Sequence, residues 1–235
     1  FAAARLEARA KISGSLTEPE GALRLLVEDA SAPMGRIGHL DMDASVARDV
    51  GAAASGFTVR ANARASGLTL ADAALARAVG DSAKFDFLAH ASNLDSMNVS
   101  AASLESGAGR LTFTGQAGPR KIDGRARLSI PELNQFSSLA KRDLRGALTL
   151  AVAIAGSPRE GRVSAVLDGG VKDPRLGVPA LDGLLGGKAS VKGVVATDDG
   201  GVRFDRLSIA GAHVDALLDG KATNDLANLK IAVDA

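Results

Sequence analysis

Residues Gly146–Gly156, with the sequence GALTLAVAIAG, constrain the fold of this chain more than any other stretch. At alternate positions stand Leu148, Leu150, Val152 and Ile154, and only Ala and Thr lie between them. A β-strand sends successive side chains to opposite faces, whereas a helix, with a period of about 3.6 residues, would scatter these aliphatic side chains around its circumference. The stretch therefore predicts a strand with one bulky aliphatic face and one face of small residues.

The same alternation recurs along most of the chain and predicts an all-β fold of about 13 strands. At the usual strand spacing of about 4.8 Å, such strands would form a sheet roughly 60 Å long. Between Phe204 and Leu207 the alternation slips by one residue, which predicts a β-bulge. The other alternating segments are Arg5–Ser13, Leu23–Val27, Leu40–Val46, Phe57–Ala65, Phe85–Ala89, Met97–Val99, Leu111–Phe113, Ala126–Ile130, Val163–Leu167, Ala189–Val195, Phe204–Ile209, Val214–Leu218 and Leu229–Val233.

Three stretches break the two-residue period and predict short helices near residues 71–79, 134–142 and 179–185. Gly80 is placed to end the first helix, and Asn134 is placed to cap the second. Because two turns of helix are marginal alone, we expect the first and third helices to pack against the apolar sheet face, either plugging the groove that the sheet would form or closing its ends. Aliphatic pairs four residues apart would make that contact, namely Leu75, Val79, Leu181 and Leu185.

A helix–strand unit near residues 71–87 has a counterpart near residues 177–193. Five positions of the two units share one spacing, at a constant shift of 106 residues. The similarity is either a weak internal repeat or a chance match in a chain rich in Ala, Leu and Gly. We otherwise expect residues 1–235 to be one continuous β-rich segment, cut from the interior of a longer chain.

The composition indicates a thin structure with few specific partners. Hydrophobic residues make up 46% of the chain but aromatic residues only 3%, so burial must come from Leu, Val, Ile and Ala. The 28 basic and 27 acidic residues leave a net charge of +1, and we expect no nucleic-acid partner. No apolar run approaches the roughly 18 residues that a membrane-spanning helix needs.

Residues that could support catalysis or hold a metal are sparse. His39, His90 and His213 are isolated from one another, and Cys is absent. The glycines of Asp168–Gly170 and Asp198–Gly201 are explained by hairpin turns. We therefore predict no enzyme activity, no catalytic residues, no metal site and no cofactor. A small basic cluster fits a solvated outer strand face better than a contact with lipid headgroups or a partner: Arg120, Lys121, Arg125 and Arg127.

Three segments resemble a known family, namely Leu133–Gly156, Asp182–Val195 and Arg203–Ala222. They are similar to TamB of alphaproteobacteria, in the AsmA-like family, and the resemblance is strongest after residue 130. It implies a periplasmic protein, anchored in the inner membrane, whose strands form a long curved trough with an apolar lining. It also implies phospholipid movement towards the outer membrane, or assembly of outer-membrane proteins with a TamA-type partner. We expect the membrane anchor and the TamA-type contact to lie outside this fragment.

The residues and the resemblance together predict an elongated, curved, open β-sheet trough, β-taco-like, with an apolar concave groove and a few short helices. A closed sandwich would show the same alternation. An open apolar groove costs about 25 cal/mol per Å² left in water, so it would persist only if acyl chains or a partner filled it.

Three functional classes follow. The first is a bridge-like conduit segment that carries phospholipid acyl chains between the inner and outer membranes. The second is a periplasmic scaffold or chaperone-like element for outer-membrane protein (autotransporter) assembly, and the third is an enzyme or a carbohydrate-binding solenoid. For the conduit, the expected groove lining is Leu148, Leu150, Val152, Ile154, Val163, Leu167, Val191 and Ile231.

Overall fold

A computed structural model of the chain describes residues 2–14, 19–49, 56–93, 96–198, 200–223 and 227–234. Strands make up 72% of the structure and helices 12%, and the sheet is mostly antiparallel. The predicted all-β character, with helix confined to short pieces, is confirmed. The chain divides into two compact units, unit 1 (Phe1–Gln116) and unit 2 (Ala117–Ala235).

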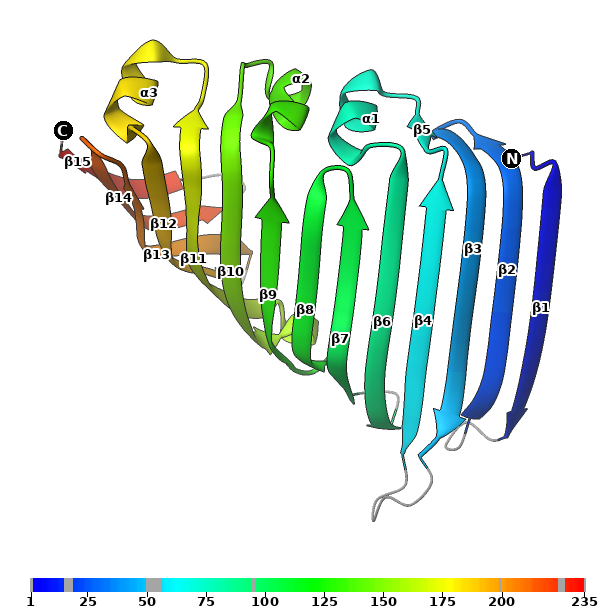
Figure 1. Cartoon of the computed structure of the whole chain (residues 1–235). Helices are drawn as coiled ribbons and strands as arrows, with labels where there is room; N and C mark the ends of the chain where they lie inside the picture. The colour runs from blue at the N-terminus through cyan, green and yellow to red at the C-terminus, as the bar shows by residue number, and fades with distance from the viewer. Residues whose placement is uncertain are drawn as a thin grey trace. The chain divides into compact units, whose positions relative to one another are not determined.

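Unit 1 is a single sheet whose long strands follow one another in sequence order (Figure 1). The short strand β5 (Thr69–Leu70) lies off this path and pairs with β3. Across the sheet, the long strands are β1 (Arg5–Gly14), β2 (Pro19–Ala32), β3 (Gly35–Arg48), β4 (Phe57–Ser66), β6 (Ser82–Asn93), β7 (Ser96–Ser106) and β8 (Gly109–Ala117).

Unit 2 is also a single sheet with its strands in sequence order. A short 3-10 turn, η2 (Pro158–Glu160), joins its second and third strands. The strands are β9 (Ile122–Ile130), β10 (Arg145–Ser157), β11 (Arg162–Arg175), β12 (Lys188–Asp198), β13 (Gly201–Ala210), β14 (Asp215–Thr223) and β15 (Ala227–Asp234).

The described residues of neither unit form a closed core. Within each unit, strands contact chiefly their neighbours in the sheet, so no second sheet of described residues lies over the first. Among the described residues, no large side chain is fully buried, and six of the ten buried hydrophobic residues are alanines. Each unit taken by itself is therefore a single layer and not a sandwich.

The strand pairing departs from strict alternation at the place that the sequence indicated. The register of β13 shifts between Phe204 and Leu207 against β14, and Arg206 there has a φ of 49°. The predicted β-bulge is confirmed. Because the extra residue restores the parity, Phe204 and Leu207 both point to the face that carries the aliphatic side chains of β12.

The three predicted helices are present. They are α1 (Ala73–Val79), α3 (Pro179–Leu185), and a composite of η1 (Leu133–Phe136) with α2 (Ser137–Ala140). Asp72 caps α1, since its Oδ1 accepts hydrogen bonds from the backbone N–H groups of Ala74 at 2.8 Å and Leu75 at 2.9 Å. Gly80 follows α1 with a φ of 81°, which confirms that it ends the helix.

The predicted cap of the second helix is wrong. Asn134 lies inside η1, whose N-cap residue is Glu132 and makes no side-chain cap bond. The segment is held at Ser137 instead: the Leu144 N–H donates to the Ser137 hydroxyl at 3.0 Å, and that hydroxyl donates to the Leu144 carbonyl at 3.3 Å.

The turn predicted at Asp168–Gly170 is also wrong, because β11 runs straight through it. Gly169 lies opposite Leu150, and a Cβ on Gly169 would come within 2.8 Å of the Leu150 side chain. This glycine therefore makes room for a neighbouring side chain and does not turn the chain. At the second predicted turn, β12 ends at Asp198 and β13 begins at Gly201, while Asp199 lies outside the described residues.

Elements of the two units recur at one spacing. The shift of 106 residues separates α1 from α3, the first residues of β6 and β12, and the bounds of β8 and β14. Each of the two helices is followed by a glycine of positive φ, Gly80 or Gly186, and then by a strand. The helix–strand similarity seen in the sequence is thus accompanied by matching element boundaries.

Candidate functional site

The candidate site is one face of the sheet of unit 2. On β10 the aliphatic residues are half-buried, whereas Thr149, Ala151, Ala153 and Ala155 on the other face are exposed. Residues paired across an antiparallel sheet share a face, so the register extends this pattern to neighbouring strands. Val152, for example, lies opposite Ala126 of β9 and Leu167 of β11.

We call this surface the apolar face of unit 2. Every strand of the unit contributes to it, and it contains no charged side chain. Its members are Ile122, Ala126, Leu128, Ile130, Leu148, Leu150, Val152, Ile154, Val163, Ala165, Leu167, Val171, Ala189, Val191, Val195, Val202, Phe204, Leu207, Ile209, Ala216, Leu218, Ala222, Leu229, Ile231 and Val233.

All eight residues predicted from the sequence to line a groove lie on this one face. Four belong to β10, and Val163 and Leu167 lie on the neighbouring strand β11. Val191 of β12 lies opposite Gly169, which in turn lies opposite Leu150. Ile231 of β15 lies opposite Leu218 of β14. Leu218 is two residues from Ala216 and therefore shares its face, and Ala216 pairs with Ile209 of β13. The sequence indicates which residues of a single strand share a face, and the register of the strands shows that these faces are continuous from one strand to the next.

The apolar face is only partly shielded from water. Its residues on β9 to β12 are mostly half-buried, because they pack against one another across neighbouring strands. Towards the last strand the exposure rises, and the side chain of Ile231 is 69% exposed and that of Val233 62% exposed. Nothing among the described residues of unit 2 forms a layer over this face.

The opposite face of unit 2 is mostly polar or small, with Val166, Val194 and Leu217 as apolar exceptions. Asp168 and Lys192 are paired across β11 and β12, and the Lys192 Nζ lies 3.8 Å from the Asp168 Oδ1. On β13 the Arg203 Nε forms an ion pair with the Asp205 Oδ1 at 3.0 Å. The basic cluster of the sequence belongs to this outer surface, with all four side chains exposed. Arg125 and Arg127 project from β9 opposite Ala153 and Ala151.

Unit 1 repeats this division with smaller side chains. On one face lie Leu25, Met42, Ala63 and Phe85 in a row across β2, β3, β4 and β6. Phe85 and Phe87 stack on this face, with ring centroids 6.2 Å apart. The other face of unit 1 carries most of the charged residues of β1 to β6, so each unit is an amphipathic single layer.

The helices do not cover the apolar faces as expected. Leu75 and Leu181 are each 45% exposed, whereas Val79 is half-buried and Leu185 is buried. The prediction that all four pack against the sheet is therefore wrong for the first member of each pair. The reason is position: α1 and α3 sit in the connections at the ends of strands (Figure 1).

One polar cluster could be mistaken for a catalytic site. Thr58 Oγ1 lies 2.5 Å from Asp49 Oδ1 and 2.9 Å from His90 Nδ1, and that same nitrogen lies 3.6 Å from Asp49 Oδ2. In a nucleophile–His–carboxylate triad the hydroxyl and the carboxylate contact different ring nitrogens. Here both contact Nδ1, so His90 cannot transfer a proton between them in that manner. No local sequence pattern indicates this cluster, because His90 is 32 residues from Thr58 along the chain.

The remaining candidates for chemistry do not come together. His39 and His213 are exposed. No group of three or more potential metal ligands occurs among the residues that the structure describes. In the same part of the chain, no helix is long and apolar enough to cross a bilayer.

Comparison of the chain with family models, with curated proteins and with solved structures finds no match.

Proposed function

We propose that the apolar face of unit 2 binds the acyl chains of phospholipids, and that the chain is a segment of a bridge-like lipid conduit in the periplasm. One observation carries this proposal: a continuous aliphatic surface spans all seven strands of unit 2 in register, with no second layer over it in the described residues. The proposal assigns no catalytic step to the chain.

The size of the surface supports a ligand or partner. Seven strands of about nine residues give a face on the order of 1,000 Å² from ordinary strand spacing and rise. The largest apolar patch on a typical monomer is about 300–600 Å². A surface of this extent is costly in water, at about 25 cal/mol per Å², and binding removes that cost.

The chemistry of the surface favours acyl chains in particular. Leu, Val, Ile and Ala offer no hydrogen-bonding group, so they provide contact without fixing a ligand in one position. Unlike small-molecule pockets, the face has no converging polar groups that would orient a specific substrate. We propose that the apolar side is the concave side of a β-taco-like trough, along which acyl chains slide. The periplasmic location, the inner-membrane anchor and a TamA-type partner beyond this segment belong to the same proposal.

A second candidate is a scaffold for outer-membrane protein assembly. It is supported by the same apolar face, over which no layer lies in the described residues of unit 2. Contiguous exposed apolar patches also mark protein–protein interaction sites. In this alternative the apolar face shields the apolar side chains of a client strand.

Variants that place a charge on one face or the other of β10 distinguish the lipid conduit from the assembly scaffold. Leu150→Arg puts a cation on the apolar face, and Ala151→Arg puts the same cation on the exposed opposite face as a matched control. A photo-crosslinking residue at Leu167, which lies opposite Val152 on the apolar face, reports contact with phospholipid in cells. Because an Arg on a single layer can extend its charged end to water, both variants should retain the wild-type melting temperature within a few degrees.

The conduit predicts that Leu150→Arg abolishes lipid crosslinks and that Ala151→Arg retains them. Undiminished crosslinks in a folded Leu150→Arg protein would exclude β10 from the lipid path. Unfolding of that variant alone would mean that the face is a sealed core, which would contradict the proposal. Crosslinks to protein and none to lipid would favour the scaffold.

A further inference from the structure

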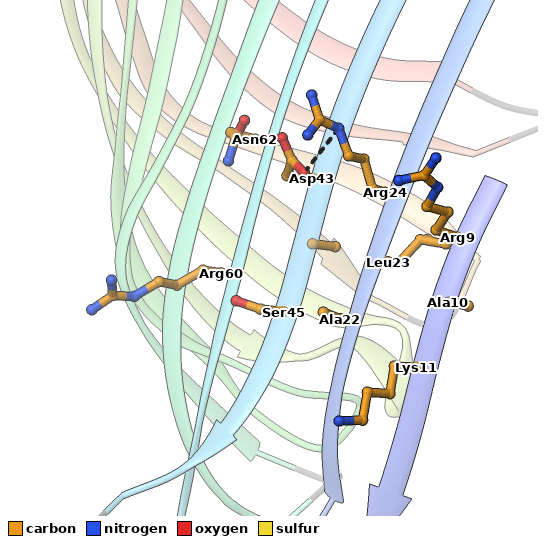
Figure 2. Close-up of a pocket in the computed structure, with 11 residues that line it drawn as sticks. Arg9, Ala10, Lys11, Ala22, Leu23, Arg24, Asp43, Ser45, Arg60 and Asn62 are labelled. Carbon is orange, nitrogen blue, oxygen red and sulfur yellow. Dashed lines mark ion pairs between the residues drawn. The ribbon is translucent and has the colours of Figure 1, made fainter. Parts of the chain in front are cut away.

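The polar face of unit 1 contains a hollow that the lipid proposal does not use. It lies over β1 to β4, where pairing aligns two rows of side chains (Figure 2). One row runs Lys11, Ala22, Ser45, Arg60, and the other, two residues further along the strands, runs Arg9, Arg24, Asp43, Asn62. The hollow is therefore built by the register of four strands.

Small side chains form the middle of the hollow. Ala22 and Ser45 stand between Lys11 and Arg60, which are separated by three strand spacings, or about 14 Å. The space has a volume of about 420 Å³. This lies within the roughly 300–1,000 Å³ of small-molecule sites. The hollow is thus large enough for a group the size of a phosphorylated glycerol.

The lining is strongly cationic. Four cations line the space against one carboxylate, that of Asp43. Arg24 is the only one of the four with ion pairs to described residues, and both are long, at 3.9 Å to Asp41 and 3.9 Å to Asp43. The other three, Arg9, Lys11 and Arg60, have no carboxylate of the described residues within 4.0 Å.

The arrangement opposes like charges directly. Arg9 of β1 lies opposite Arg24 of β2, and like charges facing each other across a strand pair are destabilising. Figure 2 shows these two side chains and Lys11 on one side of the hollow, with Arg60 on the other. An anion between them would relieve the repulsion, and Arg binds phosphate oxygens in pairs of hydrogen bonds.

We infer that this hollow binds a phosphate-bearing group, either on a soluble small molecule or on a lipid headgroup. The nearby acids leave the cations available: Glu7, on the rim beside Arg9, is engaged by Arg5. The pKa of the Glu7 carboxyl is lowered mainly by Arg5, and further by Arg9 and Arg24, as expected near an excess of positive charge. The charged and polar side chains of the lining project from the face opposite the aliphatic residues of unit 1, while Ala10, Leu23 and Ala44, which also line the hollow, have the parity of the aliphatic face. The hollow belongs to unit 1 and the proposed acyl-chain site to unit 2, so the two proposals are independent.

The test compares two double variants of equal charge. Arg9→Gln with Lys11→Gln removes two cations of the hollow, and Arg125→Gln with Arg127→Gln removes two from the polar face of β9. Two probes identify the source of the phosphate: glycerol 3-phosphate, measured by calorimetry, and vesicles of phosphatidylglycerol in phosphatidylcholine, measured by sedimentation. Because the substituted side chains are exposed, we expect the hollow variant to melt like the wild type.

We expect the hollow variant to bind at least one probe about tenfold more weakly, since charge-assisted hydrogen bonds are lost, while the β9 variant changes less than about twofold. Binding of glycerol 3-phosphate would assign a soluble ligand, and binding of vesicles alone would assign a headgroup. Failure of the wild type to bind either probe, or equal loss in both variants, would overturn the inference. If the hollow variant does not fold, the amide NMR signals of Ala22 and Ser45 in the wild type decide: they must shift with the bound probe, and unchanged signals would overturn the site. The acyl-chain proposal is unaffected by these results, because its test reads lipid contact at Leu167.

Discussion

At the scale of single residues, one contact on β1 shifts the pKa values of both its members. Arg5 and Glu7 on β1 are hydrogen-bonded, and this contact lowers the pKa of the Glu7 carboxyl and raises the pKa of Arg5. We predict that Arg5→Gln raises the pKa of Glu7 towards its ordinary value, as measured by NMR titration of the side-chain carboxyl. A pKa lowered by folding stabilises the native state above the unfolded-state pKa, and this stabilisation is lost as the pH falls through the folded-state pKa. Both side chains are well exposed, so solvent screening keeps the effect on stability small.

Arg9→Gln is the matched control for that titration. Arg9 acts on Glu7 only through a smaller charge interaction, after the hydrogen bond and the charge of Arg5. The Glu7 pKa should therefore rise less in Arg9→Gln than in Arg5→Gln. Equal rises in the two variants would show that the hydrogen bond with Arg5 is not the main cause.

Two glycines that look alike in the sequence should respond oppositely to substitution. Gly146 has a φ of 115°, and a Cβ there would approach the Lys172 carbonyl oxygen to 2.5 Å, at the bulge where β10 begins. Gly183 lies within α3, and a Cβ would meet nothing within 4 Å. We predict that Gly146→Ala destabilises the protein by about 1–3 kcal/mol and that Gly183→Ala stabilises it by about 0.4–1 kcal/mol. Urea unfolding measures both, and a tolerated Gly146→Ala would contradict the strained backbone.

At the scale of elements, the sequence predicted most strands, because alternation of aliphatic and small residues is a local signal. It also located the three helical inserts, where that period is interrupted. The sequence could not predict what the helices contact. A four-residue spacing defines one face of a helix, but the position of the helix between two strands decides what that face contacts. Leu75 and Leu181 therefore remain exposed. The turn predicted at Asp168–Gly170 is wrong for a related reason. Glycine is required at position 169 by Leu150, which lies on another strand.

The apolar face of unit 2 and the cationic hollow of unit 1 differ in how far the sequence alone predicts them. Parity within β10 predicted its share of the apolar face, and the register supplied the links to Val163, Val191 and Ile231. The cationic hollow could not be predicted, because its rows join residues of four strands and exist only through pairing. Nothing in the local sequence places Lys11 near Ser45.

The helix caps give a test at this scale. Asp72 accepts two backbone hydrogen bonds at the start of α1, and removing a cap of this kind costs about 1 kcal/mol. Asp72→Ala should lower the free energy of unfolding by about that amount, whereas Asp72→Asn, which keeps an acceptor oxygen, should lose much less. Equal losses in chemical denaturation would show that the side-chain oxygen is not the stabilising group.

At the scale of the whole molecule, the single-layer units leave an unusual amount of surface in water. The accessible surface is 14714 Å² for a mass of 23.8 kDa. A compact monomer of this mass exposes about 9,900 Å² by the usual scaling of surface with mass. The excess arises because each described strand contacts chiefly its sheet neighbours, so both faces of each unit remain accessible. Stability should then depend more on ligands than it does in a protein with a closed core.

This dependence leads to a prediction for the protein in solution. A single-chain phospholipid with a zwitterionic headgroup, lauroyl lysophosphatidylcholine below its micellar concentration, should bind the apolar face and raise the melting temperature. At 100 times the dissociation constant, a ligand that binds only the folded state adds about 2.7 kcal/mol, which corresponds to roughly 5–11 °C for a chain of this length. Glycerophosphocholine, which has the same headgroup and no acyl chain, should leave the melting temperature unchanged. In Leu150→Arg the shift should shrink, because the charge interrupts the aliphatic surface, while Ala151→Arg should behave like the wild type. A lipid that lowers the melting temperature of the wild type, or an equal shift with the headgroup alone, would mean that the apolar face is not an acyl-chain site.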